Sequence, residues 1–450
     1  MPTNRSDACL VPRGPRGVPL LGSLLEFGSD PLSFFSRCAH DYGDCVAFRL
    51  GRRPAFLLNH PDLIEQLFLA DRSDFKKHSF FWRHTKRVAE RGLLVLEGEA
   101  WRCERRLLQP AFHHERIKAY GELMVACAER ITASWQPDTV IAIDEEMRQL
   151  TGHVVTQTLF GTDVMAEIAQ IRTAFDIIIA EITRRFRNPV YLPDWIPTPR
   201  NRRFQDAIAQ LDDFVYGIIR KRREAASGSN DLLSMLLQAR DEEGGRLTDA
   251  QLRDEIVTFF LAGHETTALA LSWAWYLMAL HPKEDERVVA EIRTVLKGRP
   301  PSATDAERLR YVEHVILETM RLYPPAYVIG REAMRDCTID GYSIPAGATV
   351  FMSPWVMHRD PRYFEDPQAF RPARWGDDQI KRLARYAYFP FGGGPRICIG
   401  NTFAMMEGIL LLAAIAQNFR FELLPEHPVI PDATVTLRPR YGIKMRLSRR

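Results

Sequence analysis

The sequence lacks the features of disulfide-linked, zinc-binding and membrane-spanning proteins. Its seven cysteines are scattered and odd in number, and none forms a C-x-x-C pair. Neither a disulfide framework nor a zinc or redox dithiol is therefore indicated. No stretch approaches the ~20 apolar residues of a membrane span, and Met1–Val11 has no apolar signal core. We expect a cytoplasmic protein with no membrane anchor.

Neither positive nor negative charge is in large excess. A net charge of +3 over 450 residues is too small to make nucleic acid the main partner. Hydrophobic residues make up 46% and charged residues 26% of the chain, close to ordinary globular values. These values exclude a disordered or fibrous chain. The length favours two or three domains, and one large domain stays open.

The apolar periodicity predicts a mainly α fold with small β-sheets. Two apolar runs within residues 46–58 flank a Gly51-Arg-Arg-Pro54 turn and predict a hairpin. From 61 to 296 most segments have a helical period. Thr248 and Gln251 have the spacing of a capping box, and the pattern then continues to Pro282, which predicts one long helix. Strand patterns return within 338–352, and an ordered coil over 360–391 leads to a last helix.

A glycine-rich loop places one cysteine at the start of this last helix. Residues 389–400 read Phe-Pro-Phe-Gly-Gly-Gly-Pro-Arg-Ile-Cys-Ile-Gly. The positive end of a helix stabilises an anion, so Cys398 is expected to ionise more readily than an ordinary cysteine. The glycines let a flat, bulky ligand approach the backbone, and Phe391 is placed to shield the sulfur from water. A buried structural cysteine in a glycine-rich turn is the alternative for this residue taken alone.

Small, acidic and hydroxyl residues interrupt the long predicted helix at Ala262-Gly-His-Glu-Thr-Thr267. A small residue at Ala262 leaves room above a flat ligand, and a hydroxyl at Thr266 bonding to the preceding turn opens a local bulge. Glu265 and Thr266 together supply an acid and an alcohol for proton transfer. Zinc is excluded because Ala268 stands where H-E-x-x-H needs its second histidine. A kinked helix with a surface glutamate is the alternative for the hexamer alone.

The loop and the hexamer together resemble the cytochrome P450 family. F-x-x-G-x-R-x-C-x-G, the haem-binding signature of that family, matches Phe391, Gly394, Arg396, Cys398 and Gly400. The hexamer resembles its oxygen-activation motif. The resemblance implies one large haem domain over 1–450, with a β region in 1–75, a substrate lid at 188–200 and the haem-thiolate loop and helix at 389–412. It implies heme b with Cys398 as axial ligand of the iron, O2 as cosubstrate, and electrons that come from NAD(P)H.

Further site residues follow from the same resemblance. Trp101 and Arg105 resemble the helix that binds a haem propionate, and Arg331 and Arg396 fall where relatives place propionate partners. Glu318 and Arg321 form an E-x-x-R pair, and Arg374 is the expected third member of a structural triad. Taken alone, these residues also fit core packing or ordinary surface charges.

The positions expected above the haem are mostly apolar. They predict a hydrophobic substrate of the terpenoid, fatty acid or polyketide class, placed by shape more than by charge. Besides Ala262 and Thr266, these positions are Phe80, Phe81, Thr258, Leu261, Val328 and Ile329.

No flavin, nicotinamide or iron–sulfur motif accompanies the haem signature. We therefore expect electrons to come from a separate ferredoxin or flavodoxin and its reductase. We also expect a monomer. The basic residues Lys381, Arg382 and Arg385, with Arg102 or Arg106, are expected to attract that acidic partner. The predicted function is insertion of one oxygen atom from O2 into a C–H or C=C bond. The alternatives are a peroxide-driven peroxygenase, an isomerase on the same scaffold and a non-catalytic haem sensor.

Overall fold

The computed structural model describes residues 12–70, 74–77, 85–161, 165–187, 192–193, 195–224, 231–240, 244–376 and 379–450. The chain divides into two compact units. The first comprises Met1–Trp82, Met320–Arg371 and Trp375–Cys398, and the second Arg83–Thr319, Pro372–Arg374 and Ile399–Arg450. The boundaries of a single haem domain over 1–450 stay a prediction. In the described residues, no helix has the length and apolar character needed to cross a bilayer.

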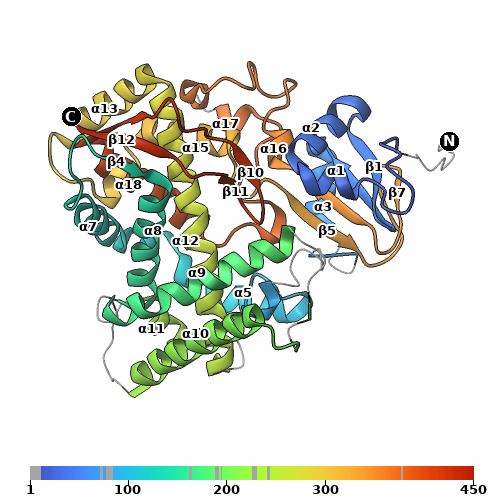
Figure 1. Ribbon diagram of the computed structural model, residues 1–450, viewed down its shortest axis with the longest axis horizontal. Coiled ribbons are helices and arrows are strands. Elements are labelled where there is room, and N and C mark those ends of the chain that lie inside the picture. Colours follow the sequence, from blue (N-terminus) through green and yellow to red (C-terminus); the bar gives the residue numbers. More distant parts are fainter. Residues whose placement is uncertain are drawn as a thin grey trace. The chain divides into compact units, whose positions relative to one another are not determined.

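The first unit is built on a mixed five-stranded sheet, of which β1 and β5 are labelled in Figure 1. The strand order is β1-β2-β8-β5-β3. Its strands are β1 Cys45–Leu50, β2 Arg53–Leu58, β3 Phe75–Lys77, β5 Ile329–Ala333 and β8 Thr349–Met352. The predicted hairpin is confirmed as the antiparallel pair β1 and β2, while β2 and β8 run parallel. A second hairpin joins β6 Cys337–Ile339 to β7 Tyr342–Ile344. The helices of this unit are α1 Leu24–Ser29, α2 Pro31–Tyr42, α3 Pro61–Leu69, α16 Pro354–Met357, α17 Gln379–Arg382 and the 3-10 turn η5 Gly394–Arg396.

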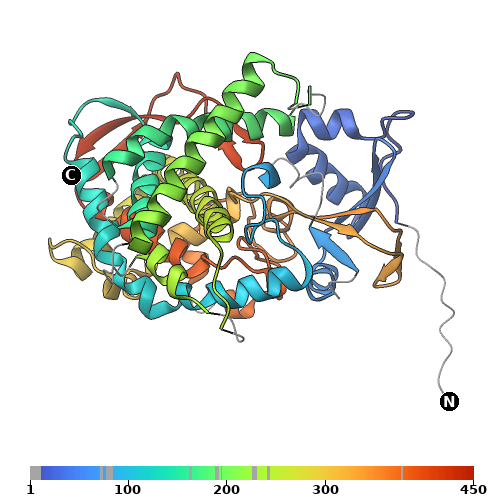
Figure 2. The same cartoon turned by 90° about the horizontal axis from the view of Figure 1, so that it is seen from below.

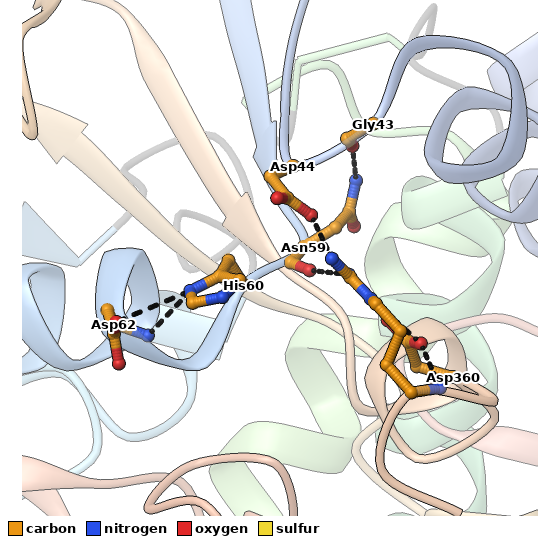
Figure 3. Close-up of polar contacts among 7 residues, drawn as sticks. Gly43, Asp44, Asn59, His60, Asp62 and Asp360 are labelled. Atoms are coloured by element: carbon orange, nitrogen blue, oxygen red, sulfur yellow. Dashed lines mark hydrogen bonds and ion pairs between the residues drawn. The ribbon is translucent and has the colours of Figure 1, made fainter.

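One arginine ties the sheet of this unit to the coil that follows α16 (Figure 3). The Arg362 guanidinium donates to Asp44 at 2.7 Å, to the Asn59 carbonyl at 2.8 Å and to Asp360 at 2.6 Å. Asn59 in turn donates to the Gly43 carbonyl at 2.9 Å. These bonds join the start of β1 and the end of β2 to a segment about 300 residues later, so the coil is anchored although it has little regular structure.

The second unit is mainly helical. Within it, α9 packs against α10, and α8 packs along α12 (Figures 1 and 2). Its helices are α5 Gly98–Leu108, α6 His114–Ala119, α7 Gly121–Thr132, α8 Ile143–Phe160, α9 Met165–Arg187, α10 Pro199–Glu224, α11 Leu232–Gln238, α12 Asp249–Leu280, α13 Pro282–Leu296, α14 Ala303–Ala306 and α18 Asn401–Ala416, with the 3-10 turns η1 Thr85–Arg87, η2 Gln109–Phe112 and η4 Pro372–Trp375. Helix α15, Arg310–Leu322, leaves this unit after Thr319.

Two small sheets complete the second unit. The order β4-β12-β9 joins Val140–Ala142, Lys444–Arg449 and Phe419–Leu423. The antiparallel pair β10 Pro431–Ala433 and β11 Leu437–Pro439 forms a hairpin that meets α12 through side-chain bonds described below. With this, the predicted mainly α fold with small sheets is confirmed.

The long helix α12 begins and ends where the sequence indicates. The Thr248 hydroxyl accepts from the Gln251 amide and the Gln251 side chain accepts from the Thr248 amide, so the capping box is present. The helix spans 32 residues and stops before Pro282, whose ring cannot continue it. The coil over 360–391 contains η4 and α17, two short turns that its irregular composition did not predict.

Candidate active site

The cysteine loop of the first unit is shaped by close backbone packing. A Cβ at Gly393 would lie 2.2 Å from the Tyr386 ring, and one at Gly394 would lie 2.4 Å from the Phe68 carbonyl oxygen. Gly394 also has φ +63°, which side chains other than glycine rarely adopt. The Gly394 amide donates to the Tyr386 hydroxyl at 3.2 Å, and the Cys398 amide donates to the Phe391 carbonyl at 3.0 Å. These contacts turn the chain so that Cys398 is exposed.

Cys398 is exposed, whereas most other cysteines of the described residues are buried or half-buried. Burial raises the pKa of Cys38 and Cys45 to about 12 and that of Cys127 to about 11, so these side chains remain thiols. Cys103 on α5 is exposed but lies in no glycine-rich loop. A metal binds the thiolate form, which must be accessible to its ligand. Cys398 therefore has the accessibility and the surroundings that iron ligation by sulfur requires.

The middle of α12 carries an accessible strip within an otherwise buried helix. All residues from Leu252 to Phe260 are buried, and so are those from Thr267 to Trp275. Between these runs Ala262 is exposed and Thr266 is half-buried. These two side chains lie one helical turn apart on the same face. Both side chains of this strip are small, so they leave room beside the helix.

Thr266 bonds back to the preceding turn as predicted. Its hydroxyl donates to the Ala262 carbonyl at 2.6 Å. The predicted bulge, however, is wrong for this structure, since the backbone is α-helical from Asp249 to Leu280. A carbonyl oxygen has two lone pairs and can accept a hydroxyl beside a helical amide, so the side-chain bond does not by itself open the helix.

Glu265 is held by the β10-β11 hairpin. Its Oε1 accepts from the Thr436 hydroxyl at 2.5 Å and from Arg438 at 2.5 Å. Burial alone raises the pKa of Glu265, but the charge of Arg438 and the bonds from Arg438 and Thr436 outweigh burial and lower the pKa below its ordinary value. The side chain is therefore a carboxylate at neutral pH.

His264 fixes this part of α12 to α8. Its ring Nε2 donates to the Arg148 carbonyl at 2.9 Å, and the Thr151 hydroxyl donates to the His264 carbonyl at 2.7 Å. Burial lowers the pKa of His264 to about 4, so the ring is neutral. A neutral histidine bonded to backbone has a positioning role here, which the sequence did not predict.

Two members of the predicted structural triad, Glu318 and Arg374, form an ion pair. Arg374 Nε donates to Glu318 at 2.9 Å, and both side chains are buried. Arg321 is fully buried and donates to the carbonyls of His358, Pro367 and Ala369 at 2.9, 2.6 and 2.9 Å. The arginine thus braces the coil that leads to the cysteine loop.

His358 gives this coil a further support. Its Nε2 accepts from the Phe389 amide at 2.9 Å, at the start of the loop. Burial lowers the pKa of His358 well below its ordinary value, which keeps the ring neutral and able to accept. No sequence signal marked this residue.

The predicted propionate residues belong to both units. In the second unit Trp101 is buried in an apolar core cluster, and Arg105, one turn later on α5, is half-buried. In the first unit Arg331 lies on β5 and Arg396 ends η5, and both are half-buried. Their propionate role stays a prediction.

The predicted substrate positions also belong to both units. Thr258, Leu261, Ala262 and Thr266 lie on α12 in the second unit, where Thr258 is buried and Leu261 packs against the core. Val328 and Ile329 lie in the first unit and pack against its cores. Phe80, Phe81 and residues 188–191 and 194 of the expected lid lie outside the described residues. The lid and the pocket stay predictions.

Sequence reasoning missed both partners of Glu265. Thr436 lies 171 and Arg438 173 residues away from it. Nothing in the hairpin sequence marks these residues, because a threonine between two short strands and an arginine on a short strand are ordinary surface residues.

Comparison with solved structures identifies the fold. The chain matches the crystal structure of the cytochrome P450DA heme domain with a TM-score of 0.89 and 25% identity, covering 98% of both chains. It also matches retinoic acid-bound cyanobacterial CYP120A1 with a TM-score of 0.87 and 27% identity, covering 98% of this chain and all of that one. The architecture is that of a cytochrome P450 heme domain.

Comparison of sequences identifies the family. The cytochrome P450 family model matches residues 12–446, and the chain belongs to that family. It is 37% identical to cyclooctatin synthase of Streptomyces melanosporofaciens, over 94% of this chain and 92% of that protein. It is 34% identical to pentalenene oxygenase of Streptomyces avermitilis, over 97% of each. The protein is a cytochrome P450 monooxygenase. The family uses haem, O2 and reducing equivalents that pass from NAD(P)H through redox partners.

Proposed function

We propose that Cys398 is the axial thiolate ligand of heme b in an enzyme that oxygenates a terpenoid-like hydrocarbon. The observation that carries the assignment is the exposed cysteine in a loop whose glycines are required by close packing against Phe68 and Tyr386. The bound haem supplies oxygen activation, assisted by electron donation from the sulfur.

In the proposed reaction a substrate R–H, one O2, two electrons and two protons give R–OH and one water. Glu265 and Thr266 are proposed to move the two protons, since the acid and the alcohol are neighbours on α12. Thr266 offers its hydroxyl on the accessible strip, and Glu265 is the ionised group that collects protons.

Four side chains are proposed to hold the haem carboxylates. Trp101 offers an indole N–H, and Arg105, Arg331 and Arg396 offer guanidinium groups that pair well with carboxylates. Phe391, Gly394, Gly400 and Ala262 are proposed to contact the haem itself. Loss of one arginine should weaken haem retention more than folding.

The substrate class is proposed from the relatives and from the helix. Three Streptomyces relatives are named cyclooctatin synthase, cyclooctat-9-en-7-ol 5-monooxygenase and pentalenene oxygenase. These names point to terpenoid frameworks, and the strip on α12 offers small and apolar groups rather than charges. A fatty acid or a polyketide is the alternative of the same hydrophobic character.

The electron donor is proposed to be an acidic ferredoxin or flavodoxin. Lys381, Arg382 and the 68%-exposed Arg385 gather near α17 in the first unit. Arg102 and Arg106 lie on the exposed side of α5 in the second. Such basic groups raise the rate of association with an acidic partner, and the rate should fall with added salt. A monomeric state and a cytoplasmic location stay predictions.

The axial ligand is tested by Cys398→Ala with Cys103→Ala as matched control. The reduced protein with carbon monoxide should show the thiolate-haem band in wild type and in C103A, because Cys103 lies on α5 outside the loop. The band should vanish in C398A. A retained band in C398A would mean that another residue ligates the iron.

The reaction class is tested by the conditions that turnover requires. Ferric protein is first screened with a library of hydrophobic compounds for a shift of the Soret band. A compound that shifts it is then supplied with O2 and a reduced ferredoxin. Product under these conditions supports the proposal. Product only with peroxide would indicate a peroxygenase, and rearrangement without O2 would indicate an isomerase. Binding without any turnover would indicate a haem sensor.

A further inference from the structure

Two acidic side chains, Glu104 on α5 and Glu255 on α12, meet inside the second unit. The two residues are 6% and 0% exposed, and their carboxyl groups lie within hydrogen-bond reach of each other. Oε1 of Glu104 and Oε2 of Glu255 are buried, and within the described residues no N–H or hydroxyl group donates to either atom. Two buried carboxylates in contact repel each other strongly, so the arrangement requires at least one proton between them.

The charged residues around this pair supply no cation to it. Burial and the charges of neighbouring acids, Asp254 among them, raise the pKa of both carboxyl groups. Arg253 donates to Asp254 at 2.7 Å and to Asp212 of α10 at 2.7 Å, so its charge is already balanced. Tyr216 of α10 and Glu90 interact electrostatically with the same group of charges, and burial raises the pKa of Tyr216, which keeps it neutral. A proton is therefore what makes the close approach of the two acids possible.

Each member of the pair is also bonded to a further segment. Glu255 Oε1 accepts from the Leu93 amide at 2.6 Å. Glu104 bonds to the Gln251 side chain, whose Oε1 accepts from the Thr248 amide in the capping box at 3.0 Å. A continuous row of hydrogen bonds thus joins the start of α12 to α5, and α5 to the chain that precedes it.

The chain that precedes α5 passes very close to α12. A Cβ at Gly92 would lie 2.7 Å from the Asp254 carbonyl oxygen. The Arg91 amide donates to Asp254 Oδ2 at 3.0 Å. The glycine permits this approach, which brings the next amide, that of Leu93, onto Glu255.

We propose that Glu104 and Glu255 share a proton and act together as positioning residues, which hold α5 and residues 91–93 against α12. The inference rests on the proposed function, in which Trp101 and Arg105 of α5 bind a haem propionate. These two residues lie on either side of Glu104 in the sequence, so a fixed α5 is a fixed propionate site.

Loss of the shared proton releases this arrangement. The O–H bond of one carboxyl group breaks and the proton passes to bulk water, which leaves two negative charges together. Leu93, Trp101 and Ile256, close to the pair in the sequence, belong to one apolar core cluster, and such surroundings stabilise charge poorly. One carboxylate then moves toward water, which loosens α5 and frees the Leu93 amide. The haem should be held less tightly at alkaline pH.

The rate of haem loss to excess apomyoglobin gives the first test. In wild type this rate should rise several-fold from neutral to alkaline pH. Glu255→Gln replaces the shared proton by an amide N–H, so E255Q should keep the slow rate throughout. Glu255→Ala removes both bonds and should lose haem several-fold faster at every pH. Glu99→Gln, at a 70%-exposed side chain of α5, is the matched control and should follow the wild-type profile.

Two outcomes of this test would overturn the proposal. One is a wild-type rate that does not change with pH. The other is a rate in E255Q that rises with pH as the wild-type rate does. A purely structural role for the glutamate would make E255Q weaker than or equal to wild type, and it would not make the rate independent of pH.

Two further measurements do not depend on haem. A protonated carboxyl group has its own infrared carbonyl band, which wild type and E99Q should show at neutral pH and E255Q should lose. The Leu93 amide, followed by hydrogen exchange and corrected for the chemical exchange rate, should lose protection at alkaline pH in wild type but not in E255Q. Absence of the band from wild type, or equal protection in both proteins, would contradict the shared proton.

Arg105→Met separates this inference from the propionate role. If R105M loses haem several-fold faster while E255Q matches wild type in all three measurements, the inference fails and the propionate role stands. If R105M retains haem as wild type does, the propionate role of Arg105 fails. The infrared band and the Leu93 amide then still decide whether the two glutamates share a proton.

Discussion

Glu318 and Arg374 form a buried ion pair within the second unit. Arg374 Nε lies 2.9 Å from Glu318 Oε1, and the two side chains are 9% and 0% exposed. The pair joins α15 to η4, 56 residues later. A buried charge that keeps its partner is tolerated, whereas one that loses its partner is costly.

Removal of one partner should therefore destabilise the fold. Glu318→Ala leaves the Arg374 charge buried, and we expect a loss of about 3–5 kcal/mol in the free energy of unfolding. Glu313→Ala on the same helix removes a pair with Arg310, whose side chain is 68% exposed. In that control the free energy of unfolding should fall by less than about 1 kcal/mol. Urea unfolding followed by circular dichroism measures both, and equal effects would contradict a structural role for the buried pair.

Substitution of Thr266 should separate haem binding from oxygen use. Thr266→Ala removes the hydroxyl that donates to Ala262 on the accessible strip. The carbon monoxide band should persist, while product per NAD(P)H falls several-fold and peroxide release rises. Thr266→Ser keeps the hydroxyl and should retain most of the coupling. Unchanged coupling in T266A would refute the proton role of this residue.

The glycine at the turn of the cysteine loop should not tolerate a side chain. Gly394→Ala places a Cβ 2.4 Å from the Phe68 carbonyl oxygen at φ +63°. We expect the free energy of unfolding to fall by about 1–3 kcal/mol and the haem to be retained less well. Gly28→Ala on α1 is the control, because a Cβ there meets nothing within 4 Å. It should be neutral or slightly stabilising. Thermal unfolding and the haem content of the purified variants provide the measurement.

Two buried carboxyl groups should make stability depend on pH. Burial raises the pKa of Glu104 on α5 to about 7 and that of Glu255 on α12 well above its ordinary value. Between pH 4.5 and 7 the folded protein keeps a proton at Glu104 that the unfolded chain has lost. Stability therefore falls as pH rises through this range, by up to about 1.4 kcal/mol per pH unit for each proton.

Substitution of Glu104 tests this dependence. Glu104→Gln should flatten the stability profile between pH 5 and 7 and should be more stable than wild type at pH 8. Glu99→Gln on the same helix is the control, because that side chain is 70% exposed. An unchanged slope in E104Q would contradict the pKa assigned to Glu104.

The sequence by itself determined the elements that depend on near neighbours. The capping box at Thr248, the stop at Pro282 and the hairpin turn at Gly51 are signals within a few residues, and each was confirmed. The cysteine loop was recognised because the cysteine and the glycines that its backbone requires lie within ten residues of one another. The regular helix at Thr266 was not predicted, because a hydroxyl bond to the preceding turn is compatible with a regular helix and with a bulged one.

Only the tertiary structure decided what surrounds these elements. The bond from Arg438 to Glu265 joins residues 173 positions apart, and His358 meets the Phe389 amide across 31. The accessible strip of α12 likewise depends on which helices cover it, and not on its own period. Such pairings depend on how distant segments pack. The residues next to a polar residue in the sequence do not indicate which distant residue it will contact.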